Sequence, residues 1–274
     1  MNITVRTQLI AGFGLLGLLV LAIGAAGVLG VGAMNASKIA LTETGAQSRL
    51  VSATKLDLAD ARLAGFNWRS RGEEVFVERF DTAVGKLTGE VGEAGLADIL
   101  PLADNYSAAF AQARQAAAIR TANLETVHDE GRATRQNLTE ISETAYADGD
   151  AEAAYYAGRA QERLLLGRLY VDRYAVSGLA ENAERAATEF ASALDALNTL
   201  LPFLQNPQRR ALTTEARDRL ERAASAFETV LEQTRARDAA LAQMDSLGPE
   251  MTVLAEAACW ARPTKSPRRP AARF

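Results

Sequence analysis

Apolar and polar positions follow a helical period from about residue 36 onward, and no stretch alternates with the period of two that strands require. Proline is scarce while Ala, Leu, Glu, Arg and Gln are common, which also favours helix. The pattern therefore predicts an all-α protein. Breaks at Gly and Pro divide it into six helices, near 36–70, 73–93, 97–147, 150–177, 180–204 and 207–257.

The third and sixth predicted helices are much longer than the others. At 1.5 Å per residue each would extend roughly 75 Å, more than one four-helix bundle needs. We therefore predict two four-helix-bundle modules stacked end to end, with the long helices running through both. Asn206 followed by Pro207 is typical of a helix start, with Asn as the cap and Pro in the first turn.

The two halves of the helical region repeat the same order of features. Arg62 corresponds to Arg168, and each is followed by a turn signal and then by a second apolar helix. Further matching positions are Phe80 with Phe190, Ala83 with Ala193, Val84 with Leu194, Leu87 with Leu197, Phe110 with Phe227, Leu124 with Leu241, and Gly131 with Gly248. The sequence therefore predicts an internal duplication.

An uncharged run from Thr7 to Ser37 precedes the helical region, between Arg6 and Lys38. A bilayer core requires about 20 apolar residues in a helix, so this run predicts a membrane-spanning segment. It is longer than the apolar core of a cleaved signal peptide, which favours an uncleaved anchor. The charges on its two sides differ too little to fix its orientation. The predicted domains are 1–35 as a short start and membrane helix, and 36–256 as the helical region.

The last segment, 257–274, differs from everything before it, with three prolines, five basic residues and no acidic one. We interpret it as a frameshifted or truncated end. The alternative is a basic tail that lies on anionic lipid or has no fixed structure.

Composition excludes several classes of function. The chain has 274 residues, a net charge of −4 and one cysteine, so no intrachain disulfide can form. No basic patch with interleaved aromatics is present, so nucleic acid is not an expected partner. Neither a phosphate-binding loop nor a Cys/His cluster occurs, and His128 stands alone among carboxylates on a long helix. We therefore expect no enzyme activity, no metal and no cofactor.

Two arginines on partly apolar helix faces are the strongest candidates for ligand binding. Arg62 has Phe66 one turn away, and Arg168 is followed by Tyr170. A guanidinium in such a setting suits a carboxylate ligand, and the nearby aromatics could line a pocket. The alternative is structural: ion pairs of Arg62 with Asp57 or Asp60 and of Arg168 with Asp172. In the same way, Trp68, Tyr106, Tyr155, Tyr156, Tyr170 and Tyr174 could be packing residues.

The stretch from Val5 to Gly14 resembles the start of a bacterial methyl-accepting chemotaxis protein. The segments 56–63 and 164–169 resemble the helical bimodular periplasmic sensor domain of that family, and the likeness extends over 1–256. Family members that bind organic acids tend to carry another Arg three residues before the first, where this chain has Ala59.

The resemblance implies a single-pass protein of the bacterial inner membrane whose sensor domain lies in the periplasm, forms a homodimer and binds a small ligand such as an organic acid. A second membrane helix and a cytoplasmic signalling module would follow in the family, so we expect a fragment that binds without onward signalling. Two alternatives stay open: the input domain of a truncated sensor histidine kinase, and a membrane-tethered helical spacer with no ligand.

Overall fold

The computed structural model describes residues 34, 38, 45–46, 48–94 and 96–260. Within these residues it contains six α-helices, two short 3-10 helices and no strand, which confirms the predicted all-α class. The first helix covers 48–71. The others are α2 (Glu74–Ala94), η1 (Ala97–Ile99), α3 (Leu100–Ala147), α4 (Ala151–Ser177), α5 (Ala180–Leu200), η2 (Leu201–Phe203) and α6 (Pro207–Trp260).

The predicted membrane segment lies outside the described residues, apart from Met34. None of the helices that the structure describes is long and apolar enough to cross a membrane. The basic end of the chain, 261–274, is also outside the described part.

Local side-chain chemistry sets the ends of the helices close to their predicted positions. The Asp150 carboxylate accepts a hydrogen bond from the backbone N–H of Ala153 (3.1 Å) and caps the start of α4. Gly178 has a φ of 67°, which ends α4 in the left-handed conformation that glycine favours. The side-chain oxygen of Asn206 accepts from the backbone N–H of Gln208 (2.9 Å), which confirms the predicted cap of α6.

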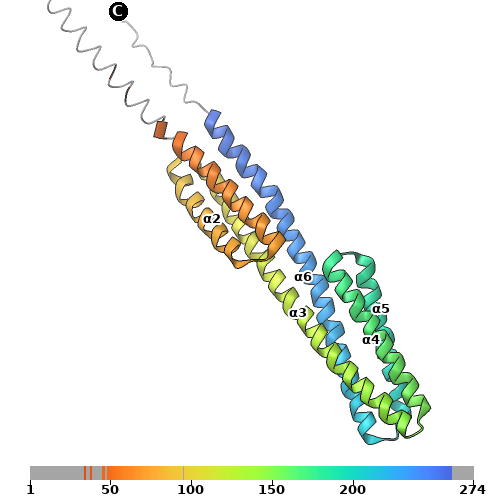
Figure 1. The fold of residues 1–274 in the computed structure, drawn as a ribbon. Helices are drawn as coiled ribbons and strands as arrows, with labels where there is room; N and C mark the ends of the chain where they lie inside the picture. Colours follow the sequence, from red (N-terminus) through yellow and green to blue (C-terminus); the bar gives the residue numbers. More distant parts are fainter. Residues whose placement is uncertain (1–33, 35–37, 39–44, 47, 95, 261–274) are drawn as a thin grey trace, which may run out of the picture. The chain divides into compact units, whose positions relative to one another are not determined.

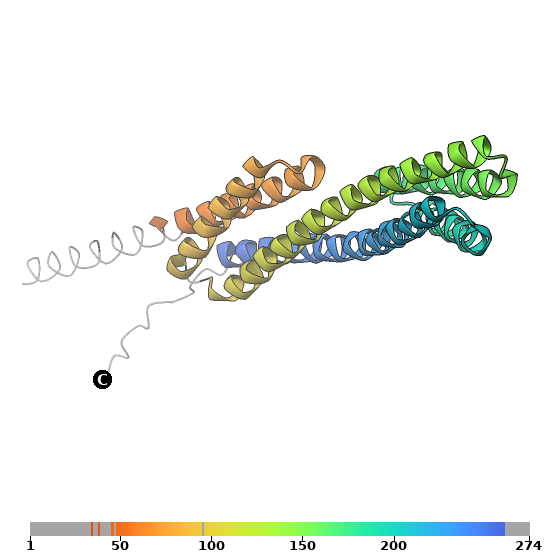
Figure 2. The same ribbon diagram turned by 90° about the horizontal axis from the view of Figure 1, so that it is seen from below.

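The chain forms two compact units, and each is built from both halves of the sequence (Figure 1). The first unit contains the described residues up to Asn105 together with those from Leu247 on, and the second contains Tyr106–Ser246. In the second unit, α4 and α5 form an antiparallel pair beside parts of α3 and α6, as a second view also shows (Figure 2). Its core combines side chains of all four helices, among them Ile141, Leu164, Phe190, Leu197 and Phe227.

Burial follows the predicted duplication. The matched phenylalanines Phe80 and Phe190 are both fully buried, and so are Phe110 and Phe227. The same holds for Leu87 with Leu197 and for Ala83 with Ala193. Two halves of unlike sequence therefore place the same positions of the repeat in their cores.

The clearest sign of duplication is a reciprocal contact between arginine and glycine. In the first unit the Arg62 side chain lies on Gly248 of α6, so close that a Cβ added there would be 3.0 Å from the Arg62 Nε. In the second unit the Arg168 side chain lies on Gly131 of α3, and an added Cβ would be 2.8 Å from its Cδ. Each unit thus joins an arginine of one half to the matching glycine of the other half.

One cluster of charges occurs in the second unit only. Glu130 of α3 accepts hydrogen bonds from Arg222 (2.9 Å) and Arg219 (3.1 Å) of α6. The hydrogen bond from Arg222 is the main reason that the pKa of Glu130 lies below its ordinary value. In the repeat, Glu130 stands before Gly131 where Leu247 stands before Gly248, so the first unit has no counterpart of this carboxylate.

We predict that Gly167→Ala lowers the free energy of unfolding by about 1–2 kcal/mol in chemical denaturation. An added Cβ would lie 2.6 Å from the buried ring of Phe190, and this overpacking outweighs the gain in helix propensity of roughly 1 kcal/mol. Gly158→Ala on the same helix is the matched control, since nothing lies within 4 Å of its added Cβ. It should be neutral or stabilising. Equal effects of the two changes would contradict the packing described for α4 and α5.

We also predict that Glu130→Gln destabilises the protein by about 1–3 kcal/mol at pH 7, because three charge-assisted hydrogen bonds, two from Arg222 and one from Arg219, are weakened. A carboxylate with a lowered pKa in the folded state stabilises above the unfolded value of about 4.3, and this contribution disappears as the pH falls through the folded pKa. The difference between wild type and Glu130→Gln should therefore be largest at neutral pH and shrink below about pH 4. The exposed Glu232→Gln should follow wild type across the range.

Candidate functional site

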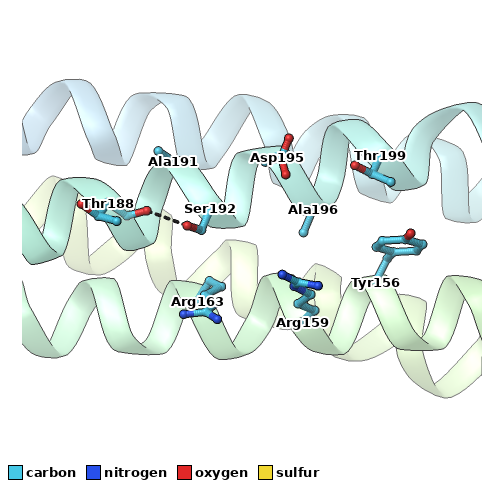
Figure 3. A pocket seen from close by; sticks show the side chains of 9 residues that line it. All are labelled: Tyr156, Arg159, Arg163, Thr188, Ala191, Ser192, Asp195, Ala196 and Thr199. Carbon is cyan, nitrogen blue, oxygen red and sulfur yellow. Dashed lines mark hydrogen bonds between the residues drawn. The ribbon is translucent and has the colours of Figure 1, made fainter.

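The candidate site is an open groove of about 720 Å³ between α4 and α5 (Figure 3). It lies wholly within the second unit. The residues that line it are Tyr156, Arg159, Arg163, Thr188, Ala191, Ser192, Asp195, Ala196 and Thr199.

Helical periodicity places these side chains on facing stripes. On α4, Tyr156, Arg159 and Arg163 are three and four residues apart, so they lie on one side of the helix. Figure 3 shows Arg159 and Arg163 between the two helices, with Ser192 and Ala196 facing them from α5. The short side chains on α5 leave the space that the arginines of α4 border.

Arg163 is partly committed to an ion pair. Its Nη1 donates to the Glu189 carboxylate at 3.0 Å, and this hydrogen bond raises the pKa of the guanidinium above its ordinary value. Its Nε is buried and, among the described residues, has no hydrogen-bond partner. Arg163 is therefore held in place at the edge of the groove with part of its donor capacity unused.

Arg159 and Asp195 are less engaged in hydrogen bonds and ion pairs than Arg163 is. Within the described part of the chain, the only hydrogen bond of Arg159 is a long one to the Tyr155 hydroxyl (3.4 Å), and Asp195 has no ion pair. The hydroxyl of Ser192 donates to the Thr188 carbonyl at 2.9 Å, so its oxygen remains able to accept. The groove can thus offer guanidinium donors to a carboxylate and oxygen acceptors to a second polar group of the same ligand.

The predicted site residues of the first unit are not in this groove. Arg62 is exposed, and its Nη1 donates to the Thr252 hydroxyl at 3.3 Å. Asp60, the alternative partner considered for Arg62, forms its ion pair with Arg79 at 3.4 Å. Phe66 is 65% exposed and forms no part of a core.

The predicted residues of the second unit lie on different sides of α4. Arg168 packs on Gly131 of α3, and its Nε is buried without a hydrogen-bond partner among the described residues. Tyr170 instead faces α5, where its hydroxyl accepts from Arg185 Nη1 (3.1 Å). Asp172, the alternative partner of Arg168, lies 3.4 Å from Nε2 of His128, which is half buried. The four predicted residues therefore do not converge on one site.

Part of this groove could be recognised from the sequence, although not from the two candidate arginines Arg62 and Arg168. Arg159 and Arg163 are four residues apart and follow Tyr156, which does line the groove as one of the aromatic candidates. Trp68, Tyr106 and Tyr174 are buried, as the packing alternative predicts. What singles out Arg163 is its position opposite Glu189, and that depends on how α5 packs.

No protein-family model matches the chain, and comparison with curated proteins finds no match.

Proposed function

We propose that the protein is a membrane-anchored sensor whose α4–α5 groove binds a small ligand that carries a carboxylate, as in bacterial chemoreceptors. The observation that supports this most is the pair Arg159 and Arg163 on one stripe of α4. One is held by Glu189, and the other has no carboxylate partner among the described residues. Two guanidinium groups at the rim of one groove form a suitable site for a carboxylate.

The wider proposal includes the parts of the chain that the structure does not describe. The apolar run before residue 38 would be the anchor in the bacterial inner membrane, and the helical region would lie in the periplasm as a homodimer. The two compact units would be the modules of a stacked double bundle. Ligand in the groove would change the packing of α4 on α5, and the long helices would carry that change along the molecule.

Two other functions fit parts of the same evidence. The input domain of a sensor histidine kinase would bind ligand in the same way. A helical spacer would bind nothing, and its arginines would serve only solubility and packing. Saturable binding distinguishes the spacer from both sensors. Catalysis is not part of the proposal, because the Ser192 hydroxyl donates to the Thr188 carbonyl and not to the Asp195 carboxylate that could act as its base.

The proposal is tested by thermal unfolding of the full chain in detergent micelles with acetate, succinate, malate and aspartate. A ligand at about 100 times its dissociation constant should add roughly 2.7 kcal/mol to the unfolding free energy. Arg159→Gln should weaken binding of the responding ligand about tenfold or more, since a hydrogen bond to a charged group is lost.

Arg235→Gln is the matched control. It removes the same charge from an exposed position of α6 that is remote from the groove lining, and it should leave binding unchanged. If the wild type unfolds cooperatively and no carboxylate stabilises it, the sensor proposal is wrong and the helical spacer becomes the favoured function. Equal losses in both variants would show only a general effect of charge.

A further inference from the structure

A second groove lies between the helix 48–71 and α2, in the first unit, with a volume of about 420 Å³. The residues that line it are Asp57, Asp60, Val75, Glu78, Arg79, Thr82, Ala83 and Lys86. It occupies the place in the duplication that the α4–α5 groove occupies in the second unit. We infer that this second groove binds a small organic cation, an aliphatic primary amine, through Asp57.

Asp57 carries the inference because the residue is nearly buried and its carboxylate has no partner among the described residues. The residue is only 9% exposed, yet it lines the groove. No hydrogen bond or ion pair joins it to any residue that the structure describes. Its carboxylate oxygens are open to the groove, because they are not among the fully buried atoms that lack a partner, and at such a nearly buried position an opposite charge or hydrogen-bond donors stabilise a carboxylate. A cationic ligand in the groove would supply both.

In the second unit, the charged residue that corresponds to Asp57 has a partner of opposite charge. Following the match of Arg62 with Arg168, Asp57 corresponds to Arg163, five residues earlier in each case. Arg163 has a partner in the carboxylate of Glu189 on α5, which accepts from its Nη1 at 3.0 Å. In the first unit Arg79 of α2 stands at the position of Glu189, and it pairs with the half-buried Asp60 instead (3.4 Å). Lys86 of α2 also lines the groove, and it forms no ion pair with Asp57. Among the residues that the structure describes, none therefore compensates the Asp57 carboxylate, and a ligand from outside the chain could do so.

The other groove residues fit an alkylammonium ion better than a metal ion. A primary ammonium has three donors, and the groove offers the Asp57 carboxylate, the exposed Glu78 and the hydroxyl oxygen of Thr82. Thr82 donates its own proton to the Glu78 carbonyl (2.8 Å), which leaves its oxygen to accept. Val75, 57% exposed, and Ala83 provide an apolar wall for an alkyl stem. Among the described residues no group of carboxylates, His or Cys converges closely enough to hold a metal.

This inference does not rest on the proposed carboxylate sensor, because it concerns another groove, another unit and a ligand of opposite charge. The test uses isothermal titration calorimetry on the full chain in detergent micelles at pH 7 and fixed ionic strength. The probe is n-butylamine, and 1-butanol serves as its neutral analogue. We expect saturable binding of one butylamine per chain and none of 1-butanol.

Asp57→Asn should weaken butylamine binding about tenfold or more, because a charge-assisted hydrogen bond is lost. Asp104→Asn, an exposed carboxylate on α3 within the same unit, removes the same charge and should bind as wild type does. Thr82→Trp fills the groove without a change of charge and should also abolish binding, which guards against a folding defect peculiar to one variant.

Absence of saturable butylamine binding to wild type would overturn the inference. Equal binding by wild type and Asp57→Asn would also overturn it, since it would show only a general attraction to an acidic protein. The melting temperature of the unliganded protein gives a third check. Asp57→Asn should leave it unchanged, because no described residue forms a hydrogen bond or ion pair with the carboxylate that is removed. A fall of several degrees would mean that the carboxylate is already satisfied inside the protein, which would contradict the inference as well.

Discussion

Each short helix pair needs a long helix from the other half of the chain to cover its apolar stripe. This exchange is most visible where Arg62 lies on Gly248 and Arg168 lies on Gly131. The glycines allow the aliphatic stems of the arginines to pack directly on the helix backbone, which covers apolar surface, and Arg62 Nη1 also reaches the Thr252 hydroxyl. Because the contact occurs twice with the partners exchanged, both halves must be present for either unit to be complete.

The same duplication explains why the two grooves resemble one another in position and differ in charge. Each lies between the first and second helix of a half, on the side that the long helices do not cover. Arg163 and Glu189 pair across one groove, whereas Asp57 and Arg79 hold the corresponding positions of the other without pairing. A change of side chains on a shared backbone would thus separate the proposed carboxylate site from the proposed ammonium site. Duplicated folds gain different chemistry in this way without a change of architecture.

Sequence patterns predicted the helices well, whereas the groove between α4 and α5 could not be read from them, for physical reasons. The ends of α4 and α6 depend on local groups such as Asp150, Gly178 and Asn206, which are recognisable along the chain. Burial of Phe80, Phe190, Phe110 and Phe227 follows the repeat and could be predicted from it. The direction in which Arg168 points could not, because it depends on whether α3 or α5 lies beside that face of α4. Arg163, five residues earlier, faces the neighbour that completes a groove, and its partner Glu189 is on another helix.

The central claim, that each unit is assembled from both halves, can be tested by dividing the chain between α3 and α4. Residues 1–147 and 148–274 would be produced separately and together, and helix content would be followed by circular dichroism during thermal unfolding. We expect that neither half alone unfolds cooperatively as a monomer, since each lacks the long helix that covers its short pair. Mixed halves should form a one-to-one complex with the helix content and cooperative transition of the whole chain. A half that unfolds cooperatively as a monomer, with its full helix content, would contradict the account.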